Sequence, residues 1–110
     1  FAGKIHAIIC RDYKNHVKGR DYYDYLFYLG KGSKFNLTYL ENKLKSTGGK
    51  IGNDETLTLE RVKGLLRERF ETVDYESAKE DVSSFISDKE QLNLWKKELF
   101  LSTLDELKAN

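Results

Sequence analysis

The stretch DYYDYLFYLG at residues 21–30 decides how this sequence folds, because its apolar side chains recur with the period of a helix. Tyr22, Leu26 and Leu29 follow one another at intervals of four and three residues, which places them on one side suited to a core. Gly30 suits the left-handed backbone position that follows many helices. We therefore predict an amphipathic helix that ends near Gly30.

A further helix is predicted just before this stretch. Within residues 1–14, Ile5, Ile8 and Ile9 follow helical spacing and form an apolar side. The segment NHVKGR at residues 15–20 then interrupts the pattern with asparagine and glycine, which favour turns. This part of the chain thus predicts two helices joined by a short connection.

The rest of the chain also shows helical patterns. Because it holds no proline, glycine, asparagine and aspartate must separate them. The expected helices run over about residues 37–47 after the N-cap Asn36, over 59–73 after Thr58, over 75–86 after Asp74, and from Asp88 to about 107 as the longest. We expect a loop at residues 46–54 and at most a brief strand within residues 55–62. The predicted fold class is all-α, with about five helices in a bundle.

Length and composition indicate one domain. A chain of 110 residues is just long enough to bury a single core without disulfides or metals. It contains no methionine and opens at Phe1 within a helical pattern, so we expect residues 1–110 to be a single helical domain cut from a larger chain. The single cysteine, Cys10, fits a reducing compartment, and no stretch approaches the ~20 apolar residues that cross a bilayer. We expect a cytoplasmic protein that does not enter a membrane.

Charge is distributed unevenly along the chain. Residues 1–70 hold 14 Lys and Arg against 8 Asp and Glu, whereas residues 71–110 hold 5 against 10. The basic first part is weak evidence for a surface that faces phosphates, since solvated helix faces explain the difference equally well.

Two basic residues on the first predicted helix share one side. Lys4 and Arg11 lie two turns apart, roughly 10 Å by the helical rise, with the small Ala7 between them. This spacing makes a basic stripe with room for a ligand. His6 and Cys10, four residues apart, provide the minimum for a thiol and base pair, although a free cysteine is more often a buried small hydrophobe.

Two carboxylates and a phenol share the polar side of residues 21–30, where Asp21, Asp24 and Tyr28 stand at i, i+3 and i+7. Carboxylates so placed could orient a hydroxyl, hold a lysine in position or help to hold a metal. The structural alternative is strong, because aspartate at a helix start is favoured by exposed amides, and Arg20 could simply pair with Asp24.

Three segments resemble one known family. The segment FAGKIHAIICR at residues 1–11, followed by KGRDYYDYLFYL at residues 18–29, resembles the AbiEii/AbiGii toxin-type nucleotidyltransferases. Their pattern there is (A/G)-K-(L/I)-x-A with a downstream arginine, then R-D-x-x-D with aromatic and leucine residues. The segment DVSSFISDKEQLNLWKKELF at residues 81–100 is similar to the family's closing region, with its aspartate, Phe-Ile pair and Leu-x-x-Trp helix. The resemblance spans nearly the whole chain.

The resemblance implies an activity and a set of residues. Lys4 matches the motif lysine that contacts nucleotide phosphates, Asp21 and Asp24 match the acidic motif positions, and Arg11 and Arg20 would add phosphate contacts. The implied reaction of the parent protein is transfer of a nucleotide from a nucleoside triphosphate to an acceptor such as tRNA. A cognate antitoxin and a role in a toxin-antitoxin or phage-defence system are likewise implied.

The sequence departs from the family pattern in one respect. In intact members, a preceding domain carries a Gly-Ser-type loop and a metal-binding Asp-x-Asp pair, and neither occurs here. We therefore expect no metal site and no cofactor in this chain, which would be inactive alone, while nucleoside triphosphate and Mg²⁺ are implied for the intact protein. Two alternatives remain, namely a non-catalytic helical module that binds RNA or an antitoxin, and a degenerate relative that no longer catalyses.

Overall fold

The structure is a computed structural model that describes residues 1–11, 17–84 and 86–110. Within these ranges the regular elements are all helical, apart from one isolated parallel bridge between Phe35 and Ala109. The elements are α1 (Ala2–Cys10), α2 (Gly19–Gly30), α3 (Leu37–Thr47), α4 (Leu59–Thr72), α5 (Tyr75–Val82), the 3-10 helix η1 (Lys89–Leu94), α6 (Lys97–Thr103) and the 3-10 helix η2 (Leu104–Glu106). The helical fold class is confirmed, and the brief strand considered at residues 55–62 does not form.

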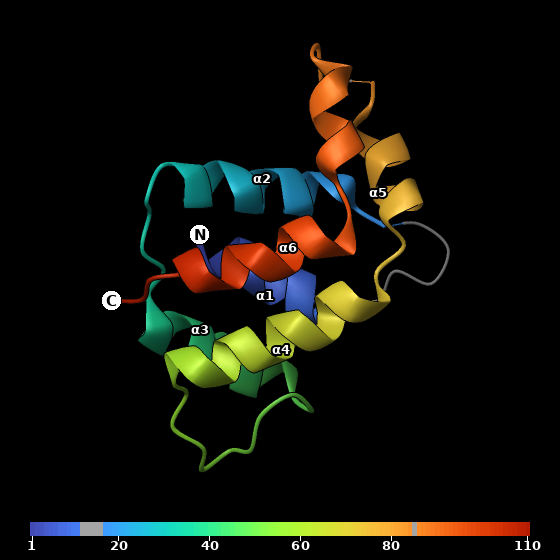
Figure 1. The fold of residues 1–110 in the computed structure, drawn as a ribbon. Coiled ribbons are helices and arrows are strands. Elements are labelled where there is room, and N and C mark those ends of the chain that lie inside the picture. The colour runs from blue at the N-terminus through green and yellow to red at the C-terminus, as the bar shows by residue number, and fades with distance from the viewer. Residues whose placement is uncertain (12–16, 85) are drawn as a thin grey trace.

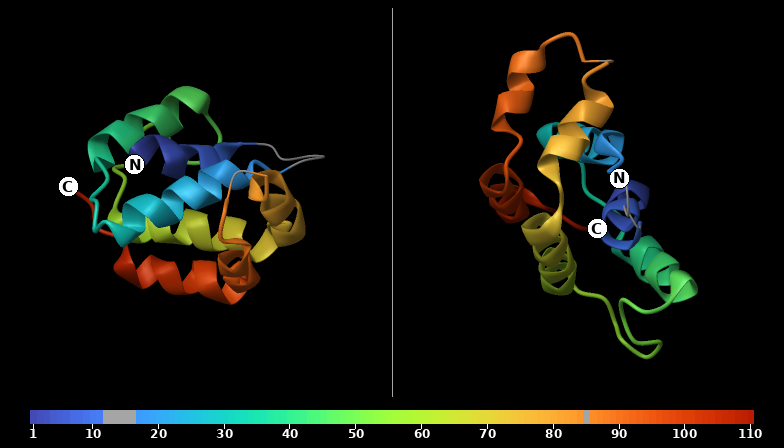
Figure 2. Two further views of the ribbon diagram at one scale, coloured as in Figure 1. Left: turned by 90° about the horizontal axis from the view of Figure 1, so that it is seen from above. Right: turned by 90° about the vertical axis from the view of Figure 1, so that its right-hand side faces the viewer.

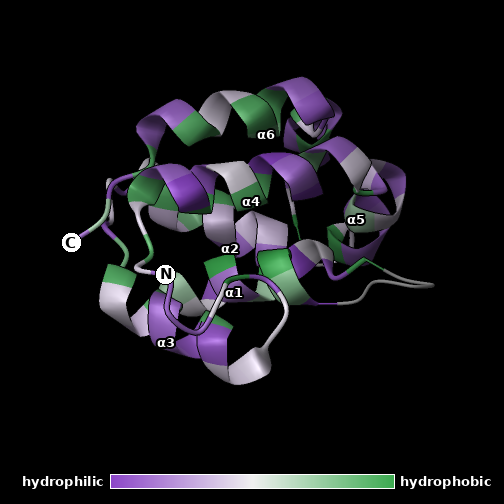
Figure 3. Ribbon diagram, turned by 90° about the horizontal axis from the view of Figure 1, so that it is seen from below, coloured by the Kyte–Doolittle hydropathy of each residue, from purple (hydrophilic) through white to green (hydrophobic). Residues whose placement is uncertain are grey.

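Helix α1 lies at the centre and packs against α2, α3 and α4. Its residues Ile5, Ile8 and Ile9 are buried, as their spacing predicts. Helices α4 and α6 lie side by side in front of α1 and α3, and α2 crosses above them with α5 packed against it (Figures 1 and 2). Helices α1, α4 and α6 carry both hydrophobic and hydrophilic positions, the amphipathic pattern that such a bundle requires (Figure 3). No helix in the described ranges is long and apolar enough to span a bilayer.

Three predicted helix starts are confirmed by their capping hydrogen bonds. The side chains of Asn36, Thr58 and Asp74 each accept from the backbone N–H three residues later, at 2.9, 3.1 and 3.1 Å. Each bond satisfies an amide that the first helical turn leaves without a partner. These local bonds fix where α3, α4 and α5 begin.

The end of the first predicted helix and the long helix predicted after Asp88 both differ from the structure. Helix α1 ends at Cys10, because Arg11 takes an extended conformation at φ −67° and ψ 134°, and residues 12–14 of the expected extension lie outside the described residues. Of the turn expected at residues 15–20, residues 15 and 16 also lie outside them, whereas Gly19 and Arg20 already belong to α2. The single long helix expected after Asp88 is wrong, because it divides into η1, α6 and η2. Trp95 leaves the helical conformation at φ −74° and ψ 87°, and its side chain is buried there. The prediction of about five helices is therefore too low.

The core side of α2 also differs from the prediction. Tyr22 is buried as expected, but Tyr25 joins it at 0 % exposure, while Leu26 and Leu29 are only partly buried. The α2 backbone continues through Gly30, and the left-handed glycine is Gly32, with φ +70°. Because α2 is covered by α1 on one side and α5 on another, its buried surface is wider than one apolar stripe.

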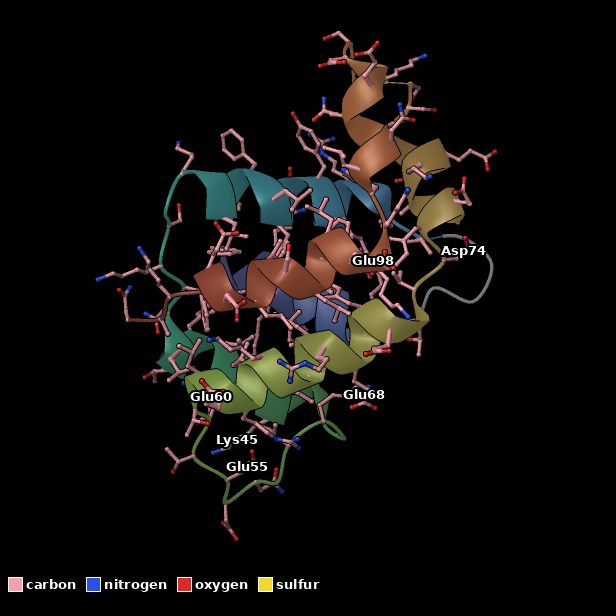
Figure 4. All side chains as sticks on the ribbon, in the orientation of Figure 1. Lys45, Glu55, Glu60, Glu68, Asp74 and Glu98 are labelled. Atoms are coloured by element: carbon pink, nitrogen blue, oxygen red, sulfur yellow. The ribbon has the colours of Figure 1, made fainter. Side chains whose placement is uncertain are left out.

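The long loop after α3 is held by two glutamates. The Leu57 N–H donates to Glu41 Oε1 at 2.5 Å, and Arg61 Nε donates to Glu55 Oε2 at 3.0 Å. Hydrogen bonding to Leu57, supported by Lys45, holds the pKa of Glu41 below its ordinary value. Lys45 and Glu55 lie at this end of the molecule (Figure 4). The loop is thus tied to both α3 and α4.

Substitution of Gly19 tests the close packing of α2 on α5. An ideal Cβ at Gly19 would lie 2.0 Å from the Ala78 carbonyl oxygen and 2.9 Å from Val82 Cγ1. Since a backbone atom cannot yield like a flexible side chain, we expect Gly19→Ala to lower the free energy of unfolding by about 2–3 kcal/mol. Urea denaturation measures this change. Gly64→Ala in α4 is the matched control, because no described atom lies within 4 Å of its Cβ, and it should gain about 0.5–1 kcal/mol.

Alkaline pH should weaken the core through Tyr25. Burial raises the pKa of Tyr25 from 10.0 to about 12, although its hydrogen bond with Thr103 acts in the opposite direction. The phenol ionises more readily in the unfolded chain. The contribution of the buried neutral phenol to the free energy of unfolding is therefore complete below pH 10 and is lost between about pH 10 and 12. The loss from this group is about 3 kcal/mol.

Urea unfolding at several pH values should show a shallower alkaline decline for Tyr25→Phe than for the wild type. Tyr39→Phe alters a half-exposed ring and should keep the wild-type decline. An identical decline in all three proteins would contradict the role given to Tyr25.

Candidate functional site

An ion-paired lysine joins α1 to α2. Lys4 Nζ lies 3.3 Å from Asp21 Oδ1 and 2.9 Å from Asp24 Oδ2. Lys4 stands in the first turn of α1, while the aspartates stand one turn apart on the first half of α2, so the contact between the two helices brings them together. The two helical sides predicted from spacing therefore face each other.

Asp21 is the buried member of this cluster, with 2 % of its surface exposed. Its Oδ2 lies 3.5 Å from Arg11 NH1, so its two oxygens face two different cations. A carboxylate is rarely buried unless it is paired in this way. Asp21 consequently fixes the positions of Lys4 and Arg11 on the same side of α1, whereas the more exposed Asp24 remains accessible.

The charge of Lys4 is maintained by its neighbours. Burial alone lowers the pKa of Lys4, but hydrogen bonds and charge attraction from Asp24 and Asp21 outweigh it, and the pKa lies above its ordinary value of 10.5. Lys4 is therefore an ammonium ion at physiological pH, and about a third of its side chain is accessible to solvent.

A pocket of about 270 Å³ opens beside this cluster. Its lining combines four cations with two carboxylates, namely Lys4, Arg11, Lys18, Arg20, Asp21 and Asp81. The excess of positive charge suits an anionic ligand. Arg20 lies here as a lining residue, while Asp24, which the structural alternative paired with Arg20, is paired with Lys4.

Sequence reasoning gave no role to two lining residues, Lys18 and Asp81. Asp81 was used only as part of the resemblance, and its place in the pocket depends on the packing of α5 against α2. Tyr28, expected beside Asp21 and Asp24, instead stacks on the Phe1 ring with centroids 5.4 Å apart. Its place is in aromatic packing and not in the pocket lining.

The carboxylates here do not fit a Mg²⁺ site. Within the described ranges, no three His, Cys, Asp or Glu side chains converge as metal ligands would. The Asp21 oxygens face Lys4 and Arg11, and Asp24 holds Lys4 at 2.9 Å. A cation that bound between the aspartates would have to displace the lysine. The arrangement can position an ammonium group and attract an anion.

The fold and this site define a helical domain whose central feature is a solvent-accessible lysine held by two aspartates within a cation-rich pocket. The family described as "Nucleotidyl transferase AbiEii toxin, Type IV TA system" matches residues 1–106. The chain belongs to this family, and the resemblance of its motifs is confirmed. No curated protein and no solved structure matches the chain.

Proposed function

We propose that this chain forms one wall of the active-site cleft of a toxin-type nucleotidyltransferase. The enzyme would transfer a nucleotide from a nucleoside triphosphate to an acceptor such as tRNA, in the cytoplasm, within a toxin-antitoxin or phage-defence system that includes a cognate antitoxin. The observation that carries the proposal is Lys4, which is held between Asp21 and Asp24 at the edge of a cation-rich pocket. Membership of the AbiEii toxin family supports it.

Lys4 is the residue proposed to act on the triphosphate. An ammonium group has three donor hydrogens, and within the described residues two face Asp21 and Asp24. The third would donate to a phosphate oxygen on which negative charge develops during transfer. Because Asp21 and Asp24 fix the ammonium before the substrate arrives, little reorganisation is needed when that charge forms.

The neighbouring residues would divide the other tasks. Asp21, buried between Lys4 and Arg11, is a positioning residue. Asp24 is more exposed and would position Lys4 or the acceptor hydroxyl. Arg11 and Arg20 line the pocket and would hold phosphate oxygens.

The family activity implies Mg²⁺, but the residues of this chain do not fit it. We therefore propose that a nucleotidyltransferase-fold domain outside this sequence would bind the metal ion. On this proposal, the isolated chain transfers no nucleotide, and activity requires the full-length protein.

Incubation of the full-length protein with each radiolabelled nucleoside triphosphate and total tRNA tests the proposal directly. The expected result is label on the RNA fraction from at least one triphosphate. A protein that binds tRNA but transfers no label would instead favour the non-catalytic binding module, which the basic pocket also fits. Absence of both binding and transfer would reject both functions.

A further inference from the structure

A second and larger pocket lies between α1 and the C-terminal end of α3, on the side of α1 next to Lys4. Its volume is about 490 Å³. Arg11, which directly follows α1, Lys43 from α3 and Lys50 from the loop after α3 line it, and none of its described lining residues is acidic. Three cations from three separate elements thus surround one hollow (Figure 1 shows the elements).

The floor of this pocket is polar. Thr47 Oγ1 lies 3.2 Å from His6 Nε2 and 4.0 Å from Cys10 Sγ, and it also donates to the Lys43 carbonyl at 3.0 Å. Burial lowers the pKa of His6, and the positive charge of Lys43 lowers it further. The imidazole is therefore mostly neutral at physiological pH, and the potential it experiences is positive.

The cations are supported by contacts around the pocket. The Lys43 ammonium lies 5.8 Å from the centroid of the Tyr39 ring, on the same helix. The Lys50 carbonyl accepts from Arg61 NH2 at 3.1 Å, which ties the loop that carries Lys50 to α4. Support of this kind reduces the entropy lost when a ligand binds.

Arg11 connects the two pockets, because it lines both of them. A row of cationic side chains therefore extends from Lys50 and Lys43 past Arg11 to Lys4. A single phosphate would fill only part of this path. A ligand with phosphates spaced along a backbone would match the cations on α3, on the loop after it and at the end of α1 together.

We propose that the pocket between α1 and α3 is a phosphate-binding subsite for the acceptor strand, in which Lys43 and Lys50 contact backbone phosphates of a single-stranded polynucleotide while Arg11 directs the strand toward Lys4. The inference rests on the proposed nucleotidyl transfer. The acceptor would lie on a face of α1 that adjoins the triphosphate pocket. The family motifs give no role to Lys43 or Lys50.

Charge reversal in the full-length protein tests the subsite. The variant K43E/K50E is compared with K34E/K89E, a control that changes net charge equally at two exposed lysines outside this pocket. Affinity for a fluorescein-labelled single-stranded oligoribonucleotide is measured by anisotropy at several salt concentrations. Thermal unfolding confirms that both variants are folded. The expected loss for K43E/K50E is at least about tenfold, with a salt slope shallower by about 1.4 for two lost phosphate contacts.

A second measurement needs no charge reversal. The His6 ring is followed by NMR, with the His6→Gln variant used to assign its signal. Addition of the unlabelled oligoribonucleotide should raise the pKa of His6 by about one unit, because a phosphate would offset the positive charge near the ring. An unchanged titration would overturn the assignment even if the lysine variants misfold.

Separate ligands identify the source of the phosphate. K43E/K50E should weaken oligoribonucleotide binding and leave the affinity for a nucleoside triphosphate or inorganic phosphate within about twofold of the control. Equal losses in both variants, or a loss confined to the triphosphate, would reject the acceptor subsite. Lysine-dependent binding without any transfer would reject the proposed function, and with it the acceptor role, while confirming that Lys43 and Lys50 bind a polynucleotide.

Discussion

Replacement of Phe100 by alanine is expected to lower the free energy of unfolding by about 3–5 kcal/mol, the usual cost of removing a buried aromatic side chain. Phe100 is fully buried on α6. Five aromatic rings have centroids 5.4 to 6.5 Å from its own, namely Tyr22, Tyr25, Phe70, Tyr75 and Trp95. These rings come from α2, α4, α5 and the segment before α6, so Phe100 joins elements distant in sequence.

The cost should be large because several neighbours would lose contacts at once. Trp95 meets Phe100 edge to face at 89°, and Tyr75 stacks on it at 23°. Rings held from four elements cannot all move into the space left by one. Since domains of this size have about 5–15 kcal/mol of stability, this loss would remove a large part of it, and the variant should unfold at much lower urea.

Urea denaturation of the wild type, Phe100→Ala and Phe100→Leu measures the effect, and the leucine variant should lose distinctly less because it fills most of the space. Phe27→Ala is the matched control, since Phe27 is 52 % exposed on α2 and its loss should cost less than about 1 kcal/mol. A Phe100→Ala curve that overlays the Phe27→Ala curve would show that the aromatic cluster does not hold the helices together.

The features predicted correctly from sequence depend on neighbouring residues. Asn36, Thr58 and Asp74 form capping bonds within three residues of themselves, so a short window contains all the information. The break at Trp95 was missed, because the apolar period continues through it and only tertiary packing draws the indole into the core. Burial of Tyr25 was missed for the same reason, since α6 lies far along the chain.

The candidate site shows a similar division. Spacing placed Lys4 on one helical side and Asp21 with Asp24 on another, and among the roles considered for these carboxylates was to hold a lysine in position, which agrees with the observed ion pairs. The pocket residue Asp81 and the pair Lys43 and Lys50 were not predicted as site residues, because they reach α1 and α2 only through the packing of α5 and α3. The periodicity of one helix predicts which of its sides is buried, but it does not predict which other helix packs against that side.

Replacement of Lys4 by alanine in the full-length protein is expected to abolish nucleotide transfer. Removal of one preorganised donor to developing charge costs about a hundredfold to a thousandfold in rate, which would bring transfer close to background. Toxicity in the host should be lost with it. Lys63→Ala is the matched control, because Lys63 also pairs with a carboxylate, that of Glu60 at 3.8 Å, but lies on α4. That control should retain wild-type transfer.

The Lys4 result must be separated from loss of the fold, because Asp21 is buried against this lysine. Lys4→Gln keeps an amide donor for Asp21 but removes the charge, so it should keep most of the stability and still lose transfer. Asp21→Asn keeps the shape of the buried side chain but leaves Lys4 and Arg11 without their shared carboxylate, and we expect it also to lose transfer. Single-turnover label transfer and thermal unfolding, measured on the same preparations, distinguish the two effects. Undiminished transfer by folded Lys4→Gln and Asp21→Asn would mean that the ion-paired cluster only joins α1 to α2.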